Sequence, residues 1–268
     1  IGFWKPHTPF NPPKRYWDMY RREDIPAISN PTPPSGAPAV AMMNANDGKP
    51  QTKDDVSEVR HGYYAATSYL DAQLGKVIDE AERLGLMENT VIVFWSDHGF
   101  HLGEQGLWGK TSNFENAARV PMIIVAPQAK RAGTKAGGPV ELLDLYPTLV
   151  DLCELPPVAG LEGVSLRTVL DNPAVRAKSA AYTQAPRPPR IQGGQSDTMG
   201  YSMRNERYRY TEWRAWNSGR VQDRELYDHQ ADPAETVNRV GDVRLAEIVQ
   251  ELAAGLARQF PPAALPAP

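Results

Sequence analysis

The sequence TVIVFWSDHG, residues 90–99, decides the fold class of this chain. Its first part, Val91 to Trp95, is an unbroken apolar run of β-branched and aromatic residues. A run of this kind without polar alternation is typical of a β-strand that is covered on both faces of a sheet. An acid, an imidazole and a glycine follow the strand directly, at Asp97, His98 and Gly99. The segment therefore predicts a buried strand that ends in residues able to carry chemistry.

The segments on either side of this strand extend an α/β pattern. Over residues 53–84 apolar residues recur at spacings of three and four, which predicts a long amphipathic helix, and Gly85 follows as its C-cap. A helix that leads into a buried strand is the unit of a parallel α/β sheet. A second apolar run at residues 120–126 predicts another buried strand, and residues 142–152 predict another helix.

The pattern changes beyond about residue 170. Short segments there alternate aromatic and charged residues and are separated by turn-length gaps, which predicts an antiparallel sheet. These segments are residues 180–184, 200–204 and 208–213. A final amphipathic helix is expected over about residues 243–257. We therefore expect the C-terminal part of an α/β catalytic domain over residues 1–170 and a small α+β subdomain over residues 171–268.

The composition excludes several classes of protein. The 268 residues contain 29 Lys and Arg against 32 Asp and Glu, a formal net charge of -3, which provides no basic field for binding nucleic acid. The single cysteine, Cys153, excludes an internal disulfide framework and a thiolate metal cluster. No apolar run approaches the ~20 residues that a membrane span needs. Because the chain starts at Ile1 without an initiator Met, we expect it to be the later part of a longer protein.

The end of the first buried strand is a candidate metal site. In open α/β sheets, ligands bind outside the carboxyl ends of the strands. Asp97 offers a hard oxygen ligand and His98 an imidazole nitrogen, and Gly99 is expected to let the backbone turn sharply and approach a ligand closely. The structural alternative is that Asp97 caps the next turn and His98 is an internally hydrogen-bonded core residue. The ligand types do not choose among calcium, magnesium, manganese and zinc.

Two further side chains are candidates for binding an anion. Lys110 ends a glycine-rich loop at residues 99–110 and follows Trp108 closely, so its ammonium is expected to be partly desolvated and to attract sulfate or phosphate strongly. His7 stands in a loop between prolines, which would aim its side chain at low entropic cost for proton transfer near neutral pH. A solvated surface lysine and a packing histidine are the alternatives.

Several segments in succession resemble the formylglycine-dependent sulfatases, within them the iduronate-2-sulfatase-like branch. They are KPHTPF (5–10), YLDAQLG (69–75), SDHG (96–99), LGEQG (102–106), WGKTSNF (108–114), VPMI (120–123), DLYPTL (144–149), MGYSMR (199–204), YRYT (208–211) and ELYD (225–228). Together these segments span nearly the whole chain. The stretch from SDHG to WGKTSNF is the most specific of them.

The resemblance implies an alkaline-phosphatase-like sulfatase fold whose N-terminal part is missing, followed by a small C-terminal subdomain. It implies a sulfuric-ester hydrolase that removes sulfate from a sulfated saccharide and binds one calcium ion. Asp97 and His98 would be metal ligands, and His7 and Lys110 would contact the sulfate and act in catalysis. Export to the periplasm, the extracellular space or a lysosome-like compartment is expected on the same ground.

The resemblance also implies a nucleophile that this chain lacks. The family's formylglycine is made from Cys or Ser in a Cys/Ser-x-Pro-x-Arg motif, and no such motif occurs here; Cys153 is not its equivalent. We therefore expect the formylglycine and the remaining calcium ligands in a missing N-terminal segment, in cis or as a companion chain. The isolated chain is expected to be inactive and to bind calcium weakly.

The identity of the sugar stays open at this stage. Candidates for lining the substrate site are Phe100, His101, Trp108, Arg187 and Trp216, each with a packing or surface role as the alternative. Residues 195–198, QSDT, contain no basic residue of the kind expected to grip a uronate carboxylate. A phosphomonoester, phosphodiester or phosphonate hydrolase on the same scaffold is the enzymatic alternative. An inactive relative that binds glycans is the non-enzymatic alternative.

Overall fold

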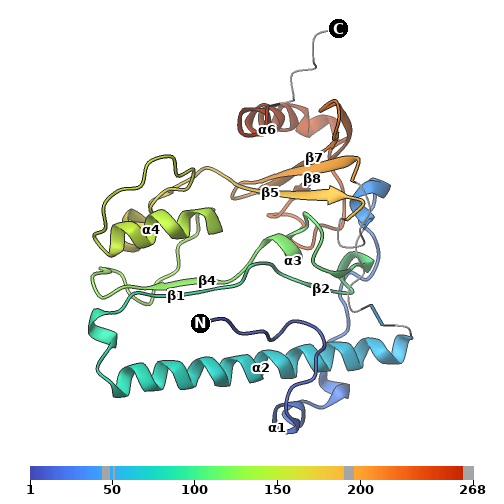
Figure 1. The fold of residues 1–268 in the computed structure, drawn as a ribbon. Coiled ribbons are helices and arrows are strands. Elements are labelled where there is room, and N and C mark those ends of the chain that lie inside the picture. The colour runs from blue at the N-terminus through green and yellow to red at the C-terminus, as the bar shows by residue number, and fades with distance from the viewer. Residues whose placement is uncertain (44–48, 51, 190–195, 262–268) are drawn as a thin grey trace.

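The computed structural model describes residues 1–43, 49–50, 52–189 and 196–261. Its helices are α1 (Lys14–Trp17), α2 (Lys53–Arg83), α3 (Glu115–Ala118), α4 (Leu145–Leu152), α5 (Arg167–Asp171) and α6 (Ala246–Gln259). Its strands are β1 (Ile92–Trp95), β2 (His101–Leu102), β3 (Trp108–Gly109), β4 (Met122–Val125), β5 (Ala181–Arg187), β6 (Thr198–Arg204), β7 (Tyr208–Ala215) and β8 (Val221–Asp228). Figure 1 shows α2 on one side of the β1–β4 ribbon and the sheet β5–β8, covered by α6, on the other.

The long helix α2 confirms the prediction from periodicity. It begins with a reciprocal capping box, in which the Thr52 side chain accepts from the Asp55 N–H and the Asp55 carboxylate accepts from the Thr52 N–H. It ends before Gly85, whose φ of 70° is the left-handed conformation that favours glycine after a helix. Neither α2 nor any other helix in the described part of the chain is long and apolar enough to cross a membrane.

The strands β1 and β4 form a two-stranded ribbon that differs from the expected parallel sheet. They pair antiparallel, with Ile92 opposite Val125 and Trp95 opposite Met122. The expectation that both faces are covered is wrong for the described residues, because Ile123 is 55% and Val125 47% exposed. One face of the ribbon thus presents apolar side chains that no described element covers, although the mixed α/β class itself is confirmed.

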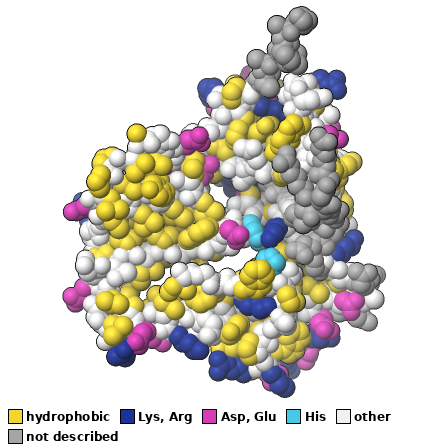
Figure 2. Space-filling model, viewed as in Figure 1, with side chains coloured by type: hydrophobic (Ala, Val, Ile, Leu, Met, Phe, Trp, Pro, Cys, Tyr) yellow, Lys and Arg dark blue, Asp and Glu magenta, His cyan; other side chains and the backbone are white. Residues whose placement is uncertain are grey.

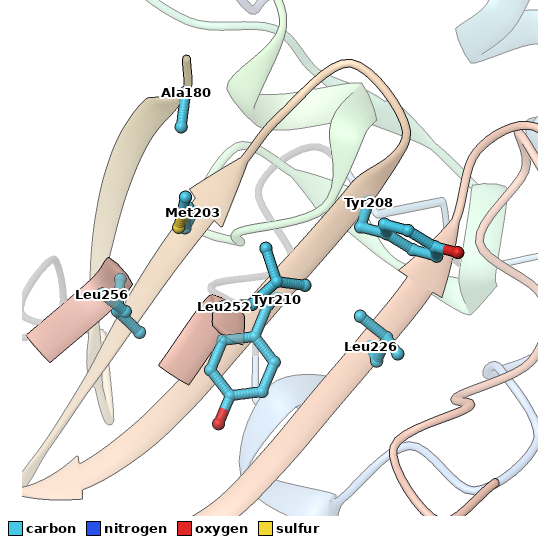
Figure 3. Close-up of a cluster of buried hydrophobic side chains, with 7 residues drawn as sticks. All are labelled: Ala180, Met203, Tyr208, Tyr210, Leu226, Leu252 and Leu256. Atoms are coloured by element: carbon cyan, nitrogen blue, oxygen red, sulfur yellow. The ribbon is translucent and has the colours of Figure 1, made fainter. Parts of the chain in front are cut away.

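The C-terminal sheet confirms the expected antiparallel arrangement, in the strand order β5–β6–β7–β8. One of its faces packs against α6, which confirms the predicted final helix. The shared core contains Ala180, Met203, Tyr208, Tyr210, Leu226, Leu252 and Leu256 (Figure 3). The terminal strand β8 extends the sheet beyond the three segments that the alternating pattern indicated.

The other face of this sheet packs against the first part of the chain. Trp213 and Tyr227 from the sheet share a core with Leu107, Phe114 and Ala41. Buried apolar contacts therefore cross the expected boundary at residue 170, and the division into two domains stays a prediction. As a consequence, the sheet lies directly against the loop that contains several of the candidate site residues.

Candidate active site

Asp97 and His98 lie at the carboxyl end of β1, where the sequence placed them. His98 Nδ1 is 2.7 Å from the Gly99 carbonyl oxygen, so this nitrogen donates its proton and leaves Nε2 with a free lone pair. His98 Nε2 is 3.7 Å from Asp97 Oδ2. Two ligand atoms at this separation both reach one cation bound at about 2.4 Å from each. The Asp97 carboxylate is 75% exposed and caps no turn among the described residues, so the pair fits a metal site.

Gly99 has a different role from the one expected. Its N–H donates to the Ala117 carbonyl oxygen at 2.8 Å. A Cβ at this position would lie 2.0 Å from the Asn116 carbonyl oxygen, a distance that no side chain tolerates. The close approach that requires glycine is therefore made by the backbone of α3 rather than by a ligand. The turn that carries Asp97 and His98 rests on α3.

His7 and Lys110 meet although they are far apart in the sequence. Lys110 Nζ lies 3.5 Å from His7 Nε2. His7 Nδ1 is 2.8 Å from the Thr8 carbonyl oxygen, so Nδ1 donates and Nε2 faces the ammonium. The exposed ring of Trp4 lies against the imidazole, with the ring centroids 4.8 Å apart. Two groups that can hold positive charge thus share one location.

Aromatic packing joins the His7 loop to the segment that follows His98. Phe10 contacts Phe100 edge to face, with ring centroids 5.8 Å apart, and both contact Tyr63 of α2. Phe100 is therefore a half-buried member of this aromatic group, and its contact with substrate stays a prediction. Figure 2 shows histidine side chains next to acidic and basic side chains in a hollow of the surface.

Other residues expected to line a sugar site lie in the interior. His101 is 0% exposed, and its Nε2 lies 2.7 Å from Ser112 Oγ. Burial lowers the pKa of His101 to about 4, so its imidazole is neutral at neutral pH. Trp108 and Arg187 are also buried, whereas Trp216 is exposed. Substrate contact by His101 and Trp108 stays a prediction, and their burial does not favour it.

An ion pair that the sequence reasoning missed holds the glycine-rich loop. Arg60 of α2 donates to the Leu102 carbonyl oxygen at 3.1 Å and to Glu104 Oε1 at 3.0 Å. Glu104 Oε2 accepts from the Leu102 N–H at 2.7 Å. These bonds tie the loop that leads to Lys110 onto α2. The sequence contained one signal for this ion pair, because Arg60 is a charged residue within the apolar face of the predicted helix.

A second group of acidic and imidazole side chains lies outside the predicted site. Glu115, His229 and Glu235 each bring one potential ligand atom to within 4.8 Å of the others. Arg209 already lies between the carboxylates, 2.5 Å from Glu115 Oε2 and 2.9 Å from Glu235 Oε1. Because the guanidinium supplies the positive charge there, this group is an ion-pair network rather than a cation site.

A cavity of about 640 Å³ lies away from both groups, between β8 and α6. Its lining includes Gln222, Arg224 and Gln250 and none of the candidate metal-binding, anion-binding or sugar-binding residues. The side-chain chemistry of the candidate site, and not the size of a cavity, therefore distinguishes it from the rest of the surface.

Known protein families match the chain in two overlapping parts. Residues 1–155 match the family model described as Sulfatase, and residues 103–260 match the one described as N-sulphoglucosamine sulphohydrolase, C-terminal. The chain is 30% identical to iduronate 2-sulfatase from Homo sapiens in an alignment 326 residues long, which covers 94% of this chain and 59% of that protein. The chain thus spans well under two thirds of this relative's length.

Solved structures share the fold. A protein in complex with its substrate D-glucosamine-2-N,6-O-disulfate superposes with a TM-score of 0.68 at 27% identity, covering 80% of this chain and 43% of that one. Phosphonate monoester hydrolase of Agrobacterium radiobacter superposes with a TM-score of 0.78 at 24% identity, covering 97% of this chain and 56% of that one. The second likeness concerns the fold alone.

Proposed function

Because this chain belongs to the sulfatase family, we propose that it supplies part of the active site of a sulfuric-ester hydrolase acting on a sulfated saccharide. The main observation in support of this proposal is that Lys110 Nζ lies 3.5 Å from His7 Nε2, although the two residues are far apart in the sequence. The residues at the end of β1 add a carboxylate and an imidazole that fit a cation. This set of charges suits an ester whose leaving part carries developing negative charge.

His7 and Lys110 are proposed to bind the sulfate oxygens and to move a proton. The Lys110 ammonium donates toward His7 Nε2 in the described structure. A bound sulfate oxygen would accept from the ammonium, and also from His7 Nε2 once that nitrogen is protonated. A protonated His7 or Lys110 would give its proton to the oxygen of the leaving alcohol. Removing one such positioned charge costs on the order of 3 kcal/mol of transition-state stabilisation.

Asp97 and His98 are proposed to hold one calcium ion. The bond from His98 Nδ1 to Gly99 fixes the tautomer in which Nε2 is free for the metal. When bound, the ion would withdraw charge from the sulfate oxygens. Two ligands do not complete a calcium shell, so we propose that the remaining ligands, and a formylglycine nucleophile, come from polypeptide outside residues 1–268.

The uncovered face of the β1–β4 ribbon is proposed to receive that additional polypeptide, in cis or as a companion chain. The face contains exposed apolar side chains from the ribbon and from the region of α4. They are Ile123 and Val125 of β4 together with Leu143, Tyr146 and Leu149. Figure 2 shows hydrophobic side chains gathered over the part of the molecule where Figure 1 places α4 and β4. The occupant that fits is the remaining part of the sulfatase α/β sheet, because the human relative is much longer than its match to this chain.

The enzymatic alternative is hydrolysis of a phosphate or phosphonate ester. The likeness to a phosphonate monoester hydrolase concerns the fold, and one fold with one arrangement of metal and cations can serve both anions. The family match and the human relative favour sulfate.

We also propose that the protein is exported, on the ground of its resemblance to the sulfatase family.

Matched esters test the proposed function. The full-length protein that contains this chain would be assayed with aryl sulfate and aryl phosphate that share one leaving group. We expect the larger kcat/KM with the sulfate. A preference for the phosphate would overturn the assignment, and binding of sulfated glycans without turnover would replace it with the glycan-binding alternative.

A further inference from the structure

A buried ion-pair network connects the C-terminal sheet to the first turn of α3. Arg209, on β7, donates from Nη2 to Glu115 Oε2 at 2.5 Å and from Nε to Glu235 Oε1 at 2.9 Å. The Glu115 backbone N–H donates to Glu235 Oε2 at 2.8 Å. His229 Nε2 lies 3.1 Å from the same Glu235 carboxylate, and Arg204 Nε lies 3.3 Å from Glu115. Both the side chain and the backbone of the first residue of α3 are therefore held by the C-terminal part.

The burial of this network makes its geometry rigid. Arg209 is 2% and Glu235 0% exposed. Charges that are removed from water keep a partner or destabilise the fold strongly, so neither group is free to move away from the other. Arg209 forms two charge-assisted bonds to different carboxylates, which fixes the direction of its guanidinium as well as its position.

The other end of α3 supports the candidate metal ligands. Ala117 accepts the Gly99 N–H at 2.8 Å, and the Asn116 carbonyl oxygen occupies the space where a Cβ on Gly99 would lie. Because α3 has four residues, its own hydrogen bonds do little to hold it in place. Contacts at both ends hold α3: Glu115 and the buried Phe114 before it at one end, and the contact with Gly99 at the other.

We propose that Arg209 is a positioning residue for the metal ligands Asp97 and His98. By holding Glu115 against Glu235, it fixes α3, and α3 in turn fixes the turn at residues 97–99 from which both ligands project. The metal part of this inference rests on the proposed function. The positioning of the turn does not depend on it.

The experiment compares two buried arginines of β7 in the full-length protein. Arg209→Met removes the contact to α3. Arg214→Met is the matched control, because Arg214 is as buried and pairs with Glu212 at 2.8 Å, but donates to the Phe260 carbonyl oxygen at the end of α6. Amide hydrogen exchange of Gly99 is measured in the metal-free protein, and Ca²⁺ affinity is measured by calorimetric titration with the metal alone.

We expect Arg209→Met to accelerate exchange of the Gly99 amide and to weaken Ca²⁺ binding, each by about tenfold. Arg214→Met is expected to lower the thermal midpoint while both readouts stay at the wild-type values. Arg209→Lys retains the charge and one ion pair, so it is expected to recover part of the Gly99 protection. Wild-type protection of Gly99 in Arg209→Met, or equal loss in the Arg214 control, would overturn the proposal.

A milder variant keeps the test decisive if Arg209→Met does not fold. Glu115→Gln retains the side-chain volume and the backbone bond to Glu235 but removes the charge that Arg209 holds. Faster exchange of Gly99 in this variant supports the proposal, and unchanged exchange contradicts it. If the wild-type protein binds no Ca²⁺, the proposed metal site fails, whereas the exchange of Gly99 still decides whether Arg209 positions the turn.

Discussion

The β1–β4 ribbon consists of apolar strands and the C-terminal sheet of strands that mix aromatic and charged residues, and the two also differ in how their strands are covered. In the sheet β5–β8, one face packs on α6 and the other on Phe114 and its neighbours, so that Leu226 is 0% exposed. In the ribbon, Ile123 is 55% exposed. A two-stranded ribbon is at best marginally stable alone. The comparison teaches that the C-terminal sheet, which is covered on both faces, stabilises the part of the chain that contains the candidate site residues.

The largest expected effect tests this difference in coverage directly. Leu226→Ala removes a fully buried side chain from the C-terminal core and is expected to lower the free energy of unfolding by about 2–5 kcal/mol. Ile123→Ala, on the exposed face of the ribbon, is expected to change it by less than about 0.5 kcal/mol in the chain of residues 1–268. Urea denaturation measures both. Equal losses would show that the ribbon is already covered.

The next effect concerns the proposed catalytic role of Lys110, which directly follows β3. Lys110→Ala in the full-length protein is expected to lower kcat for a sulfate ester about a hundredfold, because it removes the charge beside His7 that we propose binds the sulfate oxygens. Lys130→Ala, which breaks an exposed pair with Asp171, is the control and is expected to leave kcat unchanged. A wild-type rate in Lys110→Ala would remove Lys110 from the site.

A smaller effect distinguishes two glycines of the first region. Gly99→Ala is expected to cost about 1–3 kcal/mol of stability, because the new Cβ would overlap the Asn116 carbonyl oxygen. Gly75→Ala, inside α2 with no atom within 4 Å of the added Cβ, is expected to stabilise by up to about 1 kcal/mol. Thermal denaturation compares the two variants. A neutral Gly99→Ala would contradict the close contact with α3.

The smallest effect is a pH dependence of the free energy of unfolding, which comes from a buried carboxyl group in the C-terminal sheet. Burial raises the pKa of Glu225 to about 7, although Trp213 and Tyr227 donate hydrogen bonds to it. The folded state therefore binds this proton more tightly than the unfolded state does. The associated stability is complete below the ordinary pKa of about 4.5 and is lost as the pH rises toward 7.

Between pH 5 and pH 6, this one group is expected to lower the free energy of unfolding by at most about 1.4 kcal/mol. Glu225→Gln removes the titrating proton, so its free energy of unfolding should change less over the same interval. Urea denaturation at the two pH values makes the comparison. Identical pH profiles for the variant and the wild type would refute the role of Glu225.

Part of the site was predictable because its signal is local. Asp97 and His98 follow a strand run directly, and the strand-end rule was enough to select them. His7 and Lys110 were selected from their loops and from the resemblance to sulfatases, but no spacing indicated that they would meet. Arg209 was missed because an arginine between two tyrosines in a strand looks like a solvated position in an alternating pattern.

Sequence alone determined the helix α2, the strand character of residues 92–95, the antiparallel C-terminal pattern and the residue types at the end of β1. These features follow from local periodicity and from backbone preferences within a few residues. Only the tertiary structure decided that β1 and β4 pair antiparallel, that Lys110 meets His7, and that α3 rests on Gly99. Such contacts depend on the path of the whole chain and on which charges are buried together, and no short stretch of sequence contains that information.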